Sequence, residues 1–475
     1  MRLSRPSGLG VILAAEVRQV LQRYQDDPKR RQGLLQKLQR ARRYLPDITA
    51  QLKQHGLPPA LWTVALVESG FDTRARSRAG AVGLWQFNRV TAKDVALRVD
   101  RWVDARLDAY ASTRAACTLL AKLHARFGSW ELALAAYNMG YVALLRAIRK
   151  YNTNDFWALA RYEAGLPFET VRYVAHIAAL ALIDANRAAF ALPPKVPAPS
   201  DIEWLPVRGG ASLAAVARHT RVPLRQLVAL NPALRRRRAP PPRAQAYPLQ
   251  VPAGTRTAMH PRRAPWWLLE QEDSTTAPAV TRETRWHVRT EARRRTPAND
   301  PDRAVKSQAL QAGPMPADHL LPFPDAQLQR VGHRRAFLAV RGHPTLPELA
   351  RALPVSTAAL CAANALDARA RLQEGMVLRL FLPAGTNASG LPLHDGTGMQ
   401  VVEVASGAHL DAHEAQQGRR RLRYTVRQRD SLRSIARRFG LSVGDIARIN
   451  HFSRTTRPKA GDDILIYAPA GRARR

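Results

Sequence analysis

The chain has 475 residues, which is more than one ordinary hydrophobic core organises, so two or more domains are expected. Lysine and arginine number 74 against 37 aspartates and glutamates, which gives a formal net charge of +37. This charge favours polyanionic partners, namely nucleic acid, anionic membranes or a cell wall that carries peptide carboxylates, although arginine enrichment also follows from genome composition. Charge alone therefore does not choose the partner.

The cysteine and histidine patterns argue against a disulfide framework and against metal chemistry. Cys117 and Cys361 are the only cysteines, and we expect them to lie in different domains. The 13 histidines are scattered without the spacing of a zinc site. We therefore expect no metal and no cofactor.

The start of the chain does not read clearly as an export signal. Residues 1–15 have a basic end and a short apolar patch, Val11–Ala15, which Glu16 interrupts. A secretion signal needs a longer apolar core. We interpret 1–15 as an N-terminal segment: either it is the remnant of a leader, or export uses a signal that is hard to recognise. No run of about 18 apolar residues is present, so no membrane-spanning helix is expected.

Residues 16–192 show the periodicity of one helix after another. Apolar residues recur at a spacing near 3.6 in stretches such as "RRQGLLQKLQRARRYLPDITAQLKQHG" and "ASTRAACTLLAKLHARFG". Gly56 and Gly128 stand where C-caps would end such helices. We expect a helical first domain.

One glutamate interrupts an apolar helical run in "ALVESGFDTRARSRAGAVGLWQF", residues 65–87. Glu68 lies at helical spacing from three apolar residues, Leu61, Val64 and Ala65. Folding is expected to bury its carboxylate, which is costly unless the group has a partner. The pattern leaves two interpretations open: a reactive acid, or a structural glutamate paired with an arginine or a helix N-terminus.

A five-position pattern occurs three times in the rest of the chain. Its clearest copy is "YTVRQRDSLRSIARRFGLSVGDIARIN", residues 424–450, where apolar residues follow the i, i+3, i+4, i+7 spacing of a helix. The same spacing begins at Leu213 and at Leu346, and an asparagine follows the first leucine of each copy by 18 residues. These asparagines are Asn231, Asn364 and Asn450. Short β-like stretches flank each copy, so each unit is expected to be strand–helix–helix–strand.

This unit resembles the LysM domain, whose copies bind N-acetylglucosamine polymers such as peptidoglycan and chitin. The resemblance implies that the sugar lies along the loops that join strand to helix. Residues 422–469 match the pattern well. The copies at 203–253, which carries the insertion "RRRRAPPPRAQA", and at 336–384 are degenerate. For these two, the alternative is a module that only spaces or stabilises.

Proline-rich and basic stretches separate the predicted domains. Linkers are expected at 193–202, 254–335 and 385–421, and a basic tail at 470–475. The two longer linkers are expected to be disordered or loosely ordered.

Four polar clusters break the apolar patterning of the helical domain: "ES" at 68–69, "GAVGLWQF" at 80–87, "AAYNMG" at 135–140 and "LPFETVRY" at 166–173. Each cluster alone has a structural explanation, such as a tight bend or a hydrogen-bonded turn. In this order and spacing they resemble the lysozyme-like domain of the family 1 lytic transglycosylases, and most closely the membrane-bound lytic murein transglycosylase D type, which joins it to LysM repeats. The expected fold class is multidomain, with an all-α lysozyme-like domain followed by small α+β (βααβ) LysM modules.

The resemblance implies a role for each matching position. Glu68 would be the sole catalytic acid and base. Gln86 and Tyr137 would line the saccharide cleft near the scissile bond, and Ser77 would lie near the N-acetyl group of the substrate. The remaining matched positions would support the site: Ser69, Asn138, Glu169 and Tyr173.

A single carboxylate suits the chemistry of this family. Ordinary glycosidases pair two carboxylates, whereas Glu68 has no comparable partner and Asp72 lies one turn further along. Because burial disfavours a charged carboxylate, Glu68 is expected to hold a proton near neutral pH and to donate it to the oxygen between N-acetylmuramic acid and N-acetylglucosamine. The resemblance implies that the substrate's N-acetyl group stabilises the anomeric centre, and that Glu68 then accepts the C6 hydroxyl proton. A 1,6-anhydromuramyl end forms without water or a cofactor.

The sequence departs from the family pattern in two places. Asn88-Arg89 follow the Trp-Gln-Phe triplet, where the family commonly has an apolar residue and proline, and Met139 replaces a small residue. Neither change removes a proton-transfer group, so activity is still expected.

Three alternatives remain open from the sequence. They are a non-catalytic protein that binds the wall, a hydrolytic muramidase on the same fold, and a nucleic-acid-binding protein, which the charge and Arg235–Arg238 favour but no binding motif supports. We expect peptidoglycan glycan strands as the partner, no specific nucleic acid, peripheral contact with an anionic membrane or wall, and a monomer. The expected location is the periplasm or cell envelope, with outer-membrane association as a finer expectation.

Overall fold

The computed structural model describes residues 4, 8–162, 165–194, 201–241, 246–258, 312–315, 320–325, 330–450 and 452–469. Most of the predicted linker 254–335 and the whole predicted tail 470–475 lie outside the described residues. Residue contacts divide the chain into two compact units: one takes in residues 1–8, 23–118 and 183–308, and the other 9–22, 119–182 and 309–475.

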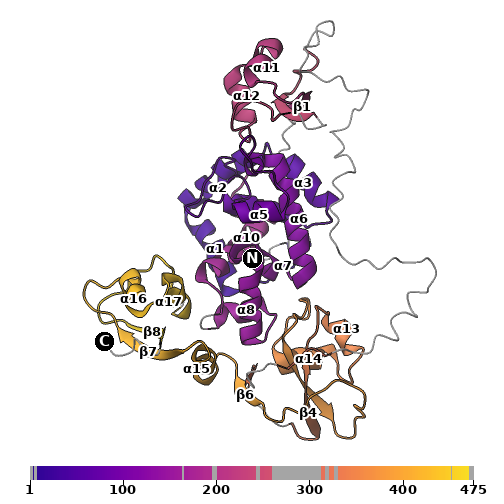
Figure 1. Cartoon of the computed structure of the whole chain (residues 1–475), viewed down its shortest axis with the longest axis vertical. Coiled ribbons are helices and arrows are strands. Elements are labelled where there is room, and N and C mark those ends of the chain that lie inside the picture. The colour runs from indigo at the N-terminus through magenta and orange to yellow at the C-terminus, as the bar shows by residue number, and fades with distance from the viewer. Residues whose placement is uncertain are drawn as a thin grey trace, which may run out of the picture. The chain divides into compact units, whose positions relative to one another are not determined.

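Helices dominate the described residues between 15 and 190, which confirms the all-α prediction for this region (Figure 1). The α-helices are α1 (Ala15–Asp26), α2 (Pro28–Ala41), α3 (Leu45–Gln54), α4 (Trp62–Glu68), α5 (Arg89–Asp94), α6 (Ala109–Phe127), α7 (Trp130–Met139), α8 (Tyr141–Tyr151), α9 (Phe156–Arg161) and α10 (Phe168–Ala185). Three short 3-10 helices accompany them: η1 (Pro59–Leu61), η2 (Ala105–Leu107) and η3 (Arg187–Phe190).

Local signals in the sequence explain where these helices begin and end. The Asp27 side chain accepts hydrogen bonds from the first turn of α2, and Ser129 and Asp155 cap α7 and α9 in the same way. Gly56 and Gly128 have φ angles of +64° and +72°, the left-handed conformation expected after a helix end.

The departure at Asn88 has a structural role of its own. Its side-chain oxygen accepts a hydrogen bond from the Thr91 backbone N–H at 2.8 Å and caps α5. An Asn N-cap satisfies a donor that the first helical turn otherwise leaves unpaired. In this chain the residue after the Trp-Gln-Phe triplet therefore starts a helix.

Three strand–helix–helix–strand modules follow, as the repeat predicts (Figure 1). The first contains β1 (Ile202–Val207), α11 (Leu213–Thr220), α12 (Leu224–Leu230) and β2 (Tyr247–Pro252). The second contains β4 (His333–Ala339), α13 (Leu346–Ala350), α14 (Thr357–Asn364) and β5 (Val377–Pro383). The third contains β7 (Arg419–Thr425), α16 (Leu432–Phe439), α17 (Val443–Ile449) and β8 (Asp463–Pro469).

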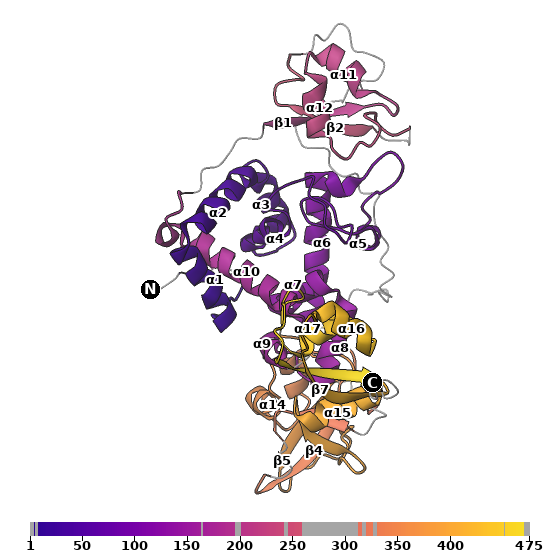
Figure 2. The same cartoon turned by 90° about the vertical axis from the view of Figure 1, so that its left-hand side faces the viewer.

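The two strands of each module pair antiparallel, as Figure 2 shows for β4 and β5. In the third module the predicted helical stripe forms the core: Leu432, Ile435, Ala436 and Phe439 are all buried. Ser431 caps α16, and Gly440 ends it with a φ angle of +68°.

The repeated asparagine holds each module together in the same way. The Asn450 amide donates to the carbonyl oxygens of Ile446, 2.9 Å away, and Leu465, 2.8 Å away, and its Oδ1 accepts from the Leu465 N–H at 2.7 Å. Asn231 and Asn364 make the same three bonds to their own helix and closing strand. The asparagine side chain thus bonds to the backbone of the closing strand as a neighbouring strand would.

The expectation of little order in 385–421 is wrong. This segment contains β6 (Gln400–Glu403) and α15 (Gly407–Ala415), and Leu410 is fully buried. Ser406 caps α15, and β6 pairs in parallel with β3 (Leu320–Phe323), which lies inside the predicted linker 254–335. Short elements of this kind escape a compositional argument because only a few apolar side chains anchor them.

Candidate active site

Glu68 is the last residue of α4. Residues Trp62 to Leu66 of that helix are buried, whereas the Glu68 side chain is only half-buried. Glu68 is therefore less buried than the residues before it in the helix, and the reason is local. The helix ends at this residue, and the chain turns away through Gly70 and Phe71, whose φ angles are +58° and +65°. The end of the helix thus explains why Glu68 is less buried than residues 62–66.

Phe71 is an unusual residue for this turn. A non-glycine residue in the left-handed region carries backbone strain, which neighbouring packing must offset. The Phe71 ring is 2% exposed, with its centroid 6.4 Å from that of Tyr44 and 6.1 Å from that of Trp62. This aromatic packing fixes the turn that follows Glu68.

Ser69 joins the end of α4 to the glycine-rich turn. Its Oγ lies 2.8 Å from the Leu84 carbonyl oxygen and 3.2 Å from the Ala65 carbonyl oxygen, and it accepts a hydrogen bond from the Phe71 N–H at 3.2 Å. The serine expected beside Glu68 is thus a physical link between two of the four sequence clusters.

The glycine-rich turn, residues 80–87, is held by close backbone packing. Gly83 has a φ angle of +86°, and a Cβ placed there would lie 1.9 Å from the Arg106 carbonyl oxygen, so only glycine fits. The Trp85 side chain is fully buried and its Nε1 donates to Thr113 Oγ1 at 3.0 Å.

Gln86 adopts a φ angle of +51° and is half-buried. Its Nε2 donates to the carbonyl oxygens of Gly83, at 2.8 Å, and Ala75, at 3.3 Å. The amide nitrogen therefore stabilises the turn itself. In the predicted role of Gln86 in the saccharide cleft, its amide oxygen is the atom that would accept a hydrogen bond from a sugar hydroxyl.

Ser77 closes the exposed turn that precedes this loop. Its Oγ accepts from the Ala81 N–H at 3.0 Å, and its own N–H donates to the Ala81 carbonyl oxygen at 2.9 Å. The side chain is exposed. Its predicted place near a substrate N-acetyl group stays a prediction.

A buried ion pair that the sequence analysis missed holds the same loop. Arg106 is 3% exposed and Asp104 1% exposed, and two hydrogen bonds of 2.8 and 2.9 Å join them. Burial by itself raises the pKa of Asp104, but hydrogen bonds from Arg106 and Arg235 outweigh it and hold that pKa below its usual value. The sequence feature that could have indicated this ion pair is the "DAR" triplet, residues 104–106, in a segment without helical periodicity.

The other matched positions lie at the end of α7 and the start of α10. Asn138 Oδ1 accepts a hydrogen bond from Thr170 Oγ1 at 2.9 Å, which fastens these two helices together. Tyr137 is half-buried and Tyr173 is 8% exposed. Glu169 is exposed in the first turn of α10, where its Oε1 accepts from the Arg454 backbone N–H at 3.1 Å.

The matched positions fall into two groups. Glu68, Ser69, Ser77 and Gln86 belong to the first compact unit, and Tyr137, Asn138, Glu169 and Tyr173 belong to the second. Within the first group, Ser69 connects the helix of Glu68 to the turn of Gln86. Within the second, the Asn138–Thr170 bond connects the two helices.

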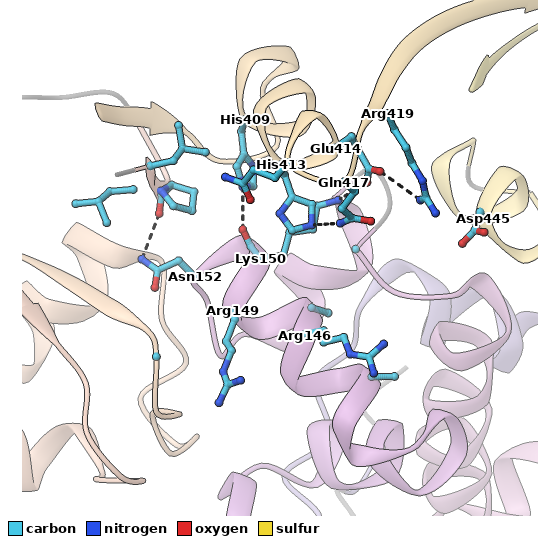
Figure 3. Close-up of a pocket in the computed structure, with 18 of the residues that line it drawn as sticks. Arg146, Arg149, Lys150, Asn152, His409, His413, Glu414, Gln417, Arg419 and Asp445 are labelled. Carbon is cyan, nitrogen blue, oxygen red and sulfur yellow. Dashed lines mark hydrogen bonds and ion pairs between the residues drawn. The ribbon is translucent and has the colours of Figure 1, made fainter. Parts of the chain in front are cut away.

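The second unit also contains a cavity of about 620 Å³, shown in Figure 3. Charged side chains of α8 and α15 line it, and the Lys150 Nζ lies 3.4 Å from the Glu414 Oε1. None of the eight matched positions is among its lining residues. We therefore do not assign the catalytic chemistry to this cavity.

His409 fastens α15 beside that cavity. Its Nδ1 accepts from the Ala405 N–H at 3.0 Å, and its Nε2 lies 2.8 Å from the Lys150 carbonyl oxygen. Burial lowers the pKa of His409 to about 4; the bond to the Lys150 carbonyl opposes that shift, and the charges of Lys150 and His413 add to it. The ring is therefore neutral at pH 7, with its proton on Nε2.

In the described ranges, no group of three or more His, Cys, Asp or Glu side chains could hold a metal ion. Cys117 and Cys361 are both free. Among the described helices, none is long and apolar enough to cross a membrane.

Family models match three parts of the chain. Residues 47–160 match the Transglycosylase SLT domain, 424–466 the LysM domain, and 202–263 the LysM-like domain of lytic transglycosylase MltD. The SLT match includes Glu68 and the two clusters that follow it. These parts of the chain thus match an SLT domain and LysM-type domains, the combination of domains that the motifs indicated.

Individual relatives are similar to the chain over part of their length. The chain is 38% identical over 152 residues to the membrane-bound lytic murein transglycosylase D of Escherichia coli, a match that covers 31% of this chain and 32% of the relative. It is 41% identical over 110 residues to a putative tributyltin chloride resistance protein of an Alteromonas species, covering 23% of this chain and 53% of that protein. The matches thus span from about a third to about half of these relatives.

A solved structure was also matched, an inactive mutant of the lytic transglycosylase Slt from Pseudomonas aeruginosa. The match has 23% identity and a TM-score of 0.23, and it covers 31% of this chain and 25% of the other.

Proposed function

We propose that this chain is a peptidoglycan lytic transglycosylase that cleaves the β-1,4 bond between N-acetylmuramic acid and N-acetylglucosamine. The observation that carries the proposal is the position of Glu68 within the SLT match. Glu68 is a half-buried residue at the end of a buried helix, and Ser69 links that helix to the glycine-rich turn.

In the proposed reaction Glu68 acts first as an acid. Its carboxyl proton passes to the glycosidic oxygen, the bond from that oxygen to C1 of the muramic acid breaks, and N-acetylglucosamine leaves as an alcohol. The substrate's own N-acetyl oxygen stabilises C1. This is why one enzyme carboxylate is enough, whereas ordinary glycosidases need two.

Glu68 then acts as a base. Its carboxylate takes the proton of the C6 hydroxyl while O6 forms a bond to C1, which restores the carboxyl group and gives a 1,6-anhydromuramyl end. No water is consumed. The amide oxygen of Gln86 and the hydroxyl of Tyr137 are proposed to hold the sugars near the broken bond, with Ser77 near the N-acetyl group.

The supporting residues have structural contacts that suit their proposed roles. Ser69 and Asn138 fasten helix ends, Tyr173 packs within the fold, and Glu169 sits in the first turn of α10. No step of this mechanism calls for a metal or an organic cofactor.

The LysM modules are proposed to hold the glycan strand while the SLT domain cuts it. The third module is the better candidate, because residues 424–466 match the LysM family model and its sequence follows the pattern closely. The net charge of +37 adds attraction to the anionic wall. We place the protein in the cell envelope, in the periplasm or against the outer membrane, acting as a monomer and without a specific nucleic-acid partner.

Mass spectrometry of purified peptidoglycan digested by the full chain tests the proposal. Wild type should release fragments with 1,6-anhydro ends, and Glu68→Gln should release none while keeping the same circular dichroism and thermal transition. The matched control is Asp72→Asn, which changes an exposed carboxylate one turn further along and should remain active.

Two other outcomes would assign a different function. Fragments with reducing ends would indicate a hydrolytic muramidase, in which water replaces the C6 hydroxyl. Wall binding without release of any fragment by the folded wild type would indicate a binding protein.

A further inference from the structure

The first LysM-like module is fastened to the segment that follows the glycine-rich loop. The Asp104 N–H donates to the Ala233 carbonyl oxygen and the Arg235 N–H donates to the Trp102 carbonyl oxygen, both at 2.9 Å. Between these bonds, Val103 and Leu234 pair as an antiparallel β-bridge. All of these residues belong to the first compact unit.

Side chains extend this contact on both sides of the bridge. The Arg236 guanidinium lies 4.8 Å from the centre of the Trp102 ring, a cation–π distance. Tyr110 and Trp204 meet edge to face, with their ring centroids 5.2 Å apart. The contact is therefore built from specific groups on both partners.

Asp104 is the centre of the contact. Arg106 Nε and Nη2 donate to its two carboxylate oxygens, and Arg235 Nη2 donates to Oδ2 at 2.9 Å. Asp104 is 1% exposed, whereas the Arg235 side chain is 36% exposed. Burying a carboxylate without cationic partners costs free energy of folding. The two guanidinium groups offset this cost for Asp104 and hold its side chain in place.

Arg106 carries the contact into the glycine-rich loop. Its Nη1 donates to the carbonyl oxygens of Phe87, at 3.2 Å, and Gly80, at 3.3 Å, which are the two ends of the loop that contains Gln86. The close approach of Gly83 to the Arg106 backbone leaves little space for the loop to shift. A continuous set of contacts thus runs from Arg235 through Asp104 and Arg106 to residues 80–87.

We propose that Arg235 and Asp104 are positioning residues, and that the first LysM-like module acts as a fixed clamp that holds the glycine-rich loop in its working geometry. The catalytic consequence rests on the proposed function, whereas the structural consequence does not. The charge of residues 235–238 by itself suggests binding to a polyanion. In this proposal Arg235, the first residue of that stretch, instead binds Asp104 in the helical domain of the same chain.

Hydrogen–deuterium exchange of the full chain, comparing wild type with Arg235→Ala, tests the clamp directly. The Val82 and Gly83 N–H groups are the reporters, because they donate to the carbonyl oxygens of Phe87, at the end of the loop, and of Ala75, in the segment before it. The expected result is exchange about tenfold faster for these amides. Arg238→Ala is the matched control: it removes an exposed arginine of the same stretch and should leave loop exchange unchanged.

Kinetics on peptidoglycan give the second readout. Arg235→Ala should lower kcat about tenfold with little change in KM, because a misplaced loop harms orientation more than binding. Arg235→Lys keeps the charge and should recover part of the loss. Asp104→Asn is expected to disturb folding as well, so the conclusion depends on the Arg235 variants.

Unchanged loop exchange in Arg235→Ala would overturn the clamp, whatever the activity. Equal effects of Arg235→Ala and Arg238→Ala would also overturn it, because a general charge effect would then explain both. A rise in KM with constant kcat would overturn the positioning role, since it would indicate that Arg235 binds substrate. If wild type proves inactive, the proposed function fails, while the exchange experiment still decides the clamp.

Discussion

The Ser69 hydroxyl lies 2.8 Å from the Leu84 carbonyl oxygen, and this bond joins the helix that ends in Glu68 to the turn that contains Gln86. Two short motifs separated by fifteen positions are thereby fixed relative to each other within one compact unit.

We expect Ser69→Ala to lower kcat about tenfold, since the helix end and the turn would lose their direct link. The free energy of unfolding should fall by about 1 kcal/mol, the typical net value of one hydrogen bond. Rates of anhydro-fragment release and urea denaturation measure these effects. Thr118→Ala, which removes a hydroxyl bonded only within its own helix, should leave the rate unchanged. A wild-type rate in Ser69→Ala would refute the linking role.

Gly83→Ala should destabilise the protein far more than Gly80→Ala. Both glycines have positive φ angles, +86° and +81°, but a Cβ at Gly83 would lie 1.9 Å from a backbone oxygen, whereas nothing lies within 4 Å of a Cβ at Gly80. The expected losses are at least about 3 kcal/mol for Gly83→Ala and about 1 kcal/mol for Gly80→Ala. Equal losses in urea denaturation would contradict the close packing against Arg106.

Asn450→Ala should loosen the third module and weaken attachment to the wall. The substitution removes three hydrogen bonds and leaves the N–H and carbonyl oxygen of Leu465 without their partner, a cost of about 2 kcal/mol. Faster hydrogen exchange in β8 and weaker co-sedimentation of the full chain with insoluble peptidoglycan would show it. Asn387→Ala changes an exposed asparagine and is the control. Unaltered exchange in β8 would exclude the asparagine as a structural tie.

Asp47 should make stability depend on pH in the acid range. Burial raises the pKa of this carboxyl to about 6; the Arg114 charge opposes the shift and the Asp108 charge adds to it. Between about pH 4 and pH 6 the folded state therefore holds a proton that the unfolded state has lost, so stability falls as pH rises.

We expect Asp47→Asn to flatten this dependence and to gain about 1–2 kcal/mol at pH 7 relative to wild type, a figure reduced for the partial exposure of the group. Urea denaturation at a series of pH values measures it. The exposed Asp94 supplies the control, since Asp94→Asn should keep the wild-type slope. An unchanged slope in Asp47→Asn would disprove the assignment.

His409 should act in the opposite direction. Its pKa is lowered to about 4 in the folded protein, so the unfolded chain takes up the proton first as pH falls below the ordinary histidine value. The stability that the neutral ring contributes is complete above about pH 6.5 and is lost as pH falls toward 4. In proton NMR, this imidazole should keep its neutral chemical shift at pH 5, and His409→Gln identifies the signal. A midpoint near 6.5 would contradict the buried, neutral ring.

Periodicity and capping residues predicted the local structure well. The spacing of Leu432, Ile435, Ala436 and Phe439 indicated α16 and its buried face, because a helix places these positions on one side of its axis. The same logic failed for α15 and β6, where too few apolar residues show a period.

The sequence motifs indicated candidate site residues, but not how exposed these residues are or which contacts support them. The motifs pointed to Glu68, and periodicity predicted that its carboxylate is buried, since periodicity cannot show that the helix ends at that residue. The repeat likewise located Asn450 without showing that it bonds to β8, because the partner is fifteen residues away.

The sequence by itself determined the helical and βααβ elements, the order of the domains and the position of the candidate acid, because these depend on spacing along the chain. Only the tertiary structure decided that Glu68 is half-buried, that Ser69 bonds to Leu84, and that Arg235 of the first LysM-like module bonds to Asp104. Such contacts depend on which surfaces pack together in the folded chain, and the local pattern of residues does not show which surfaces these are.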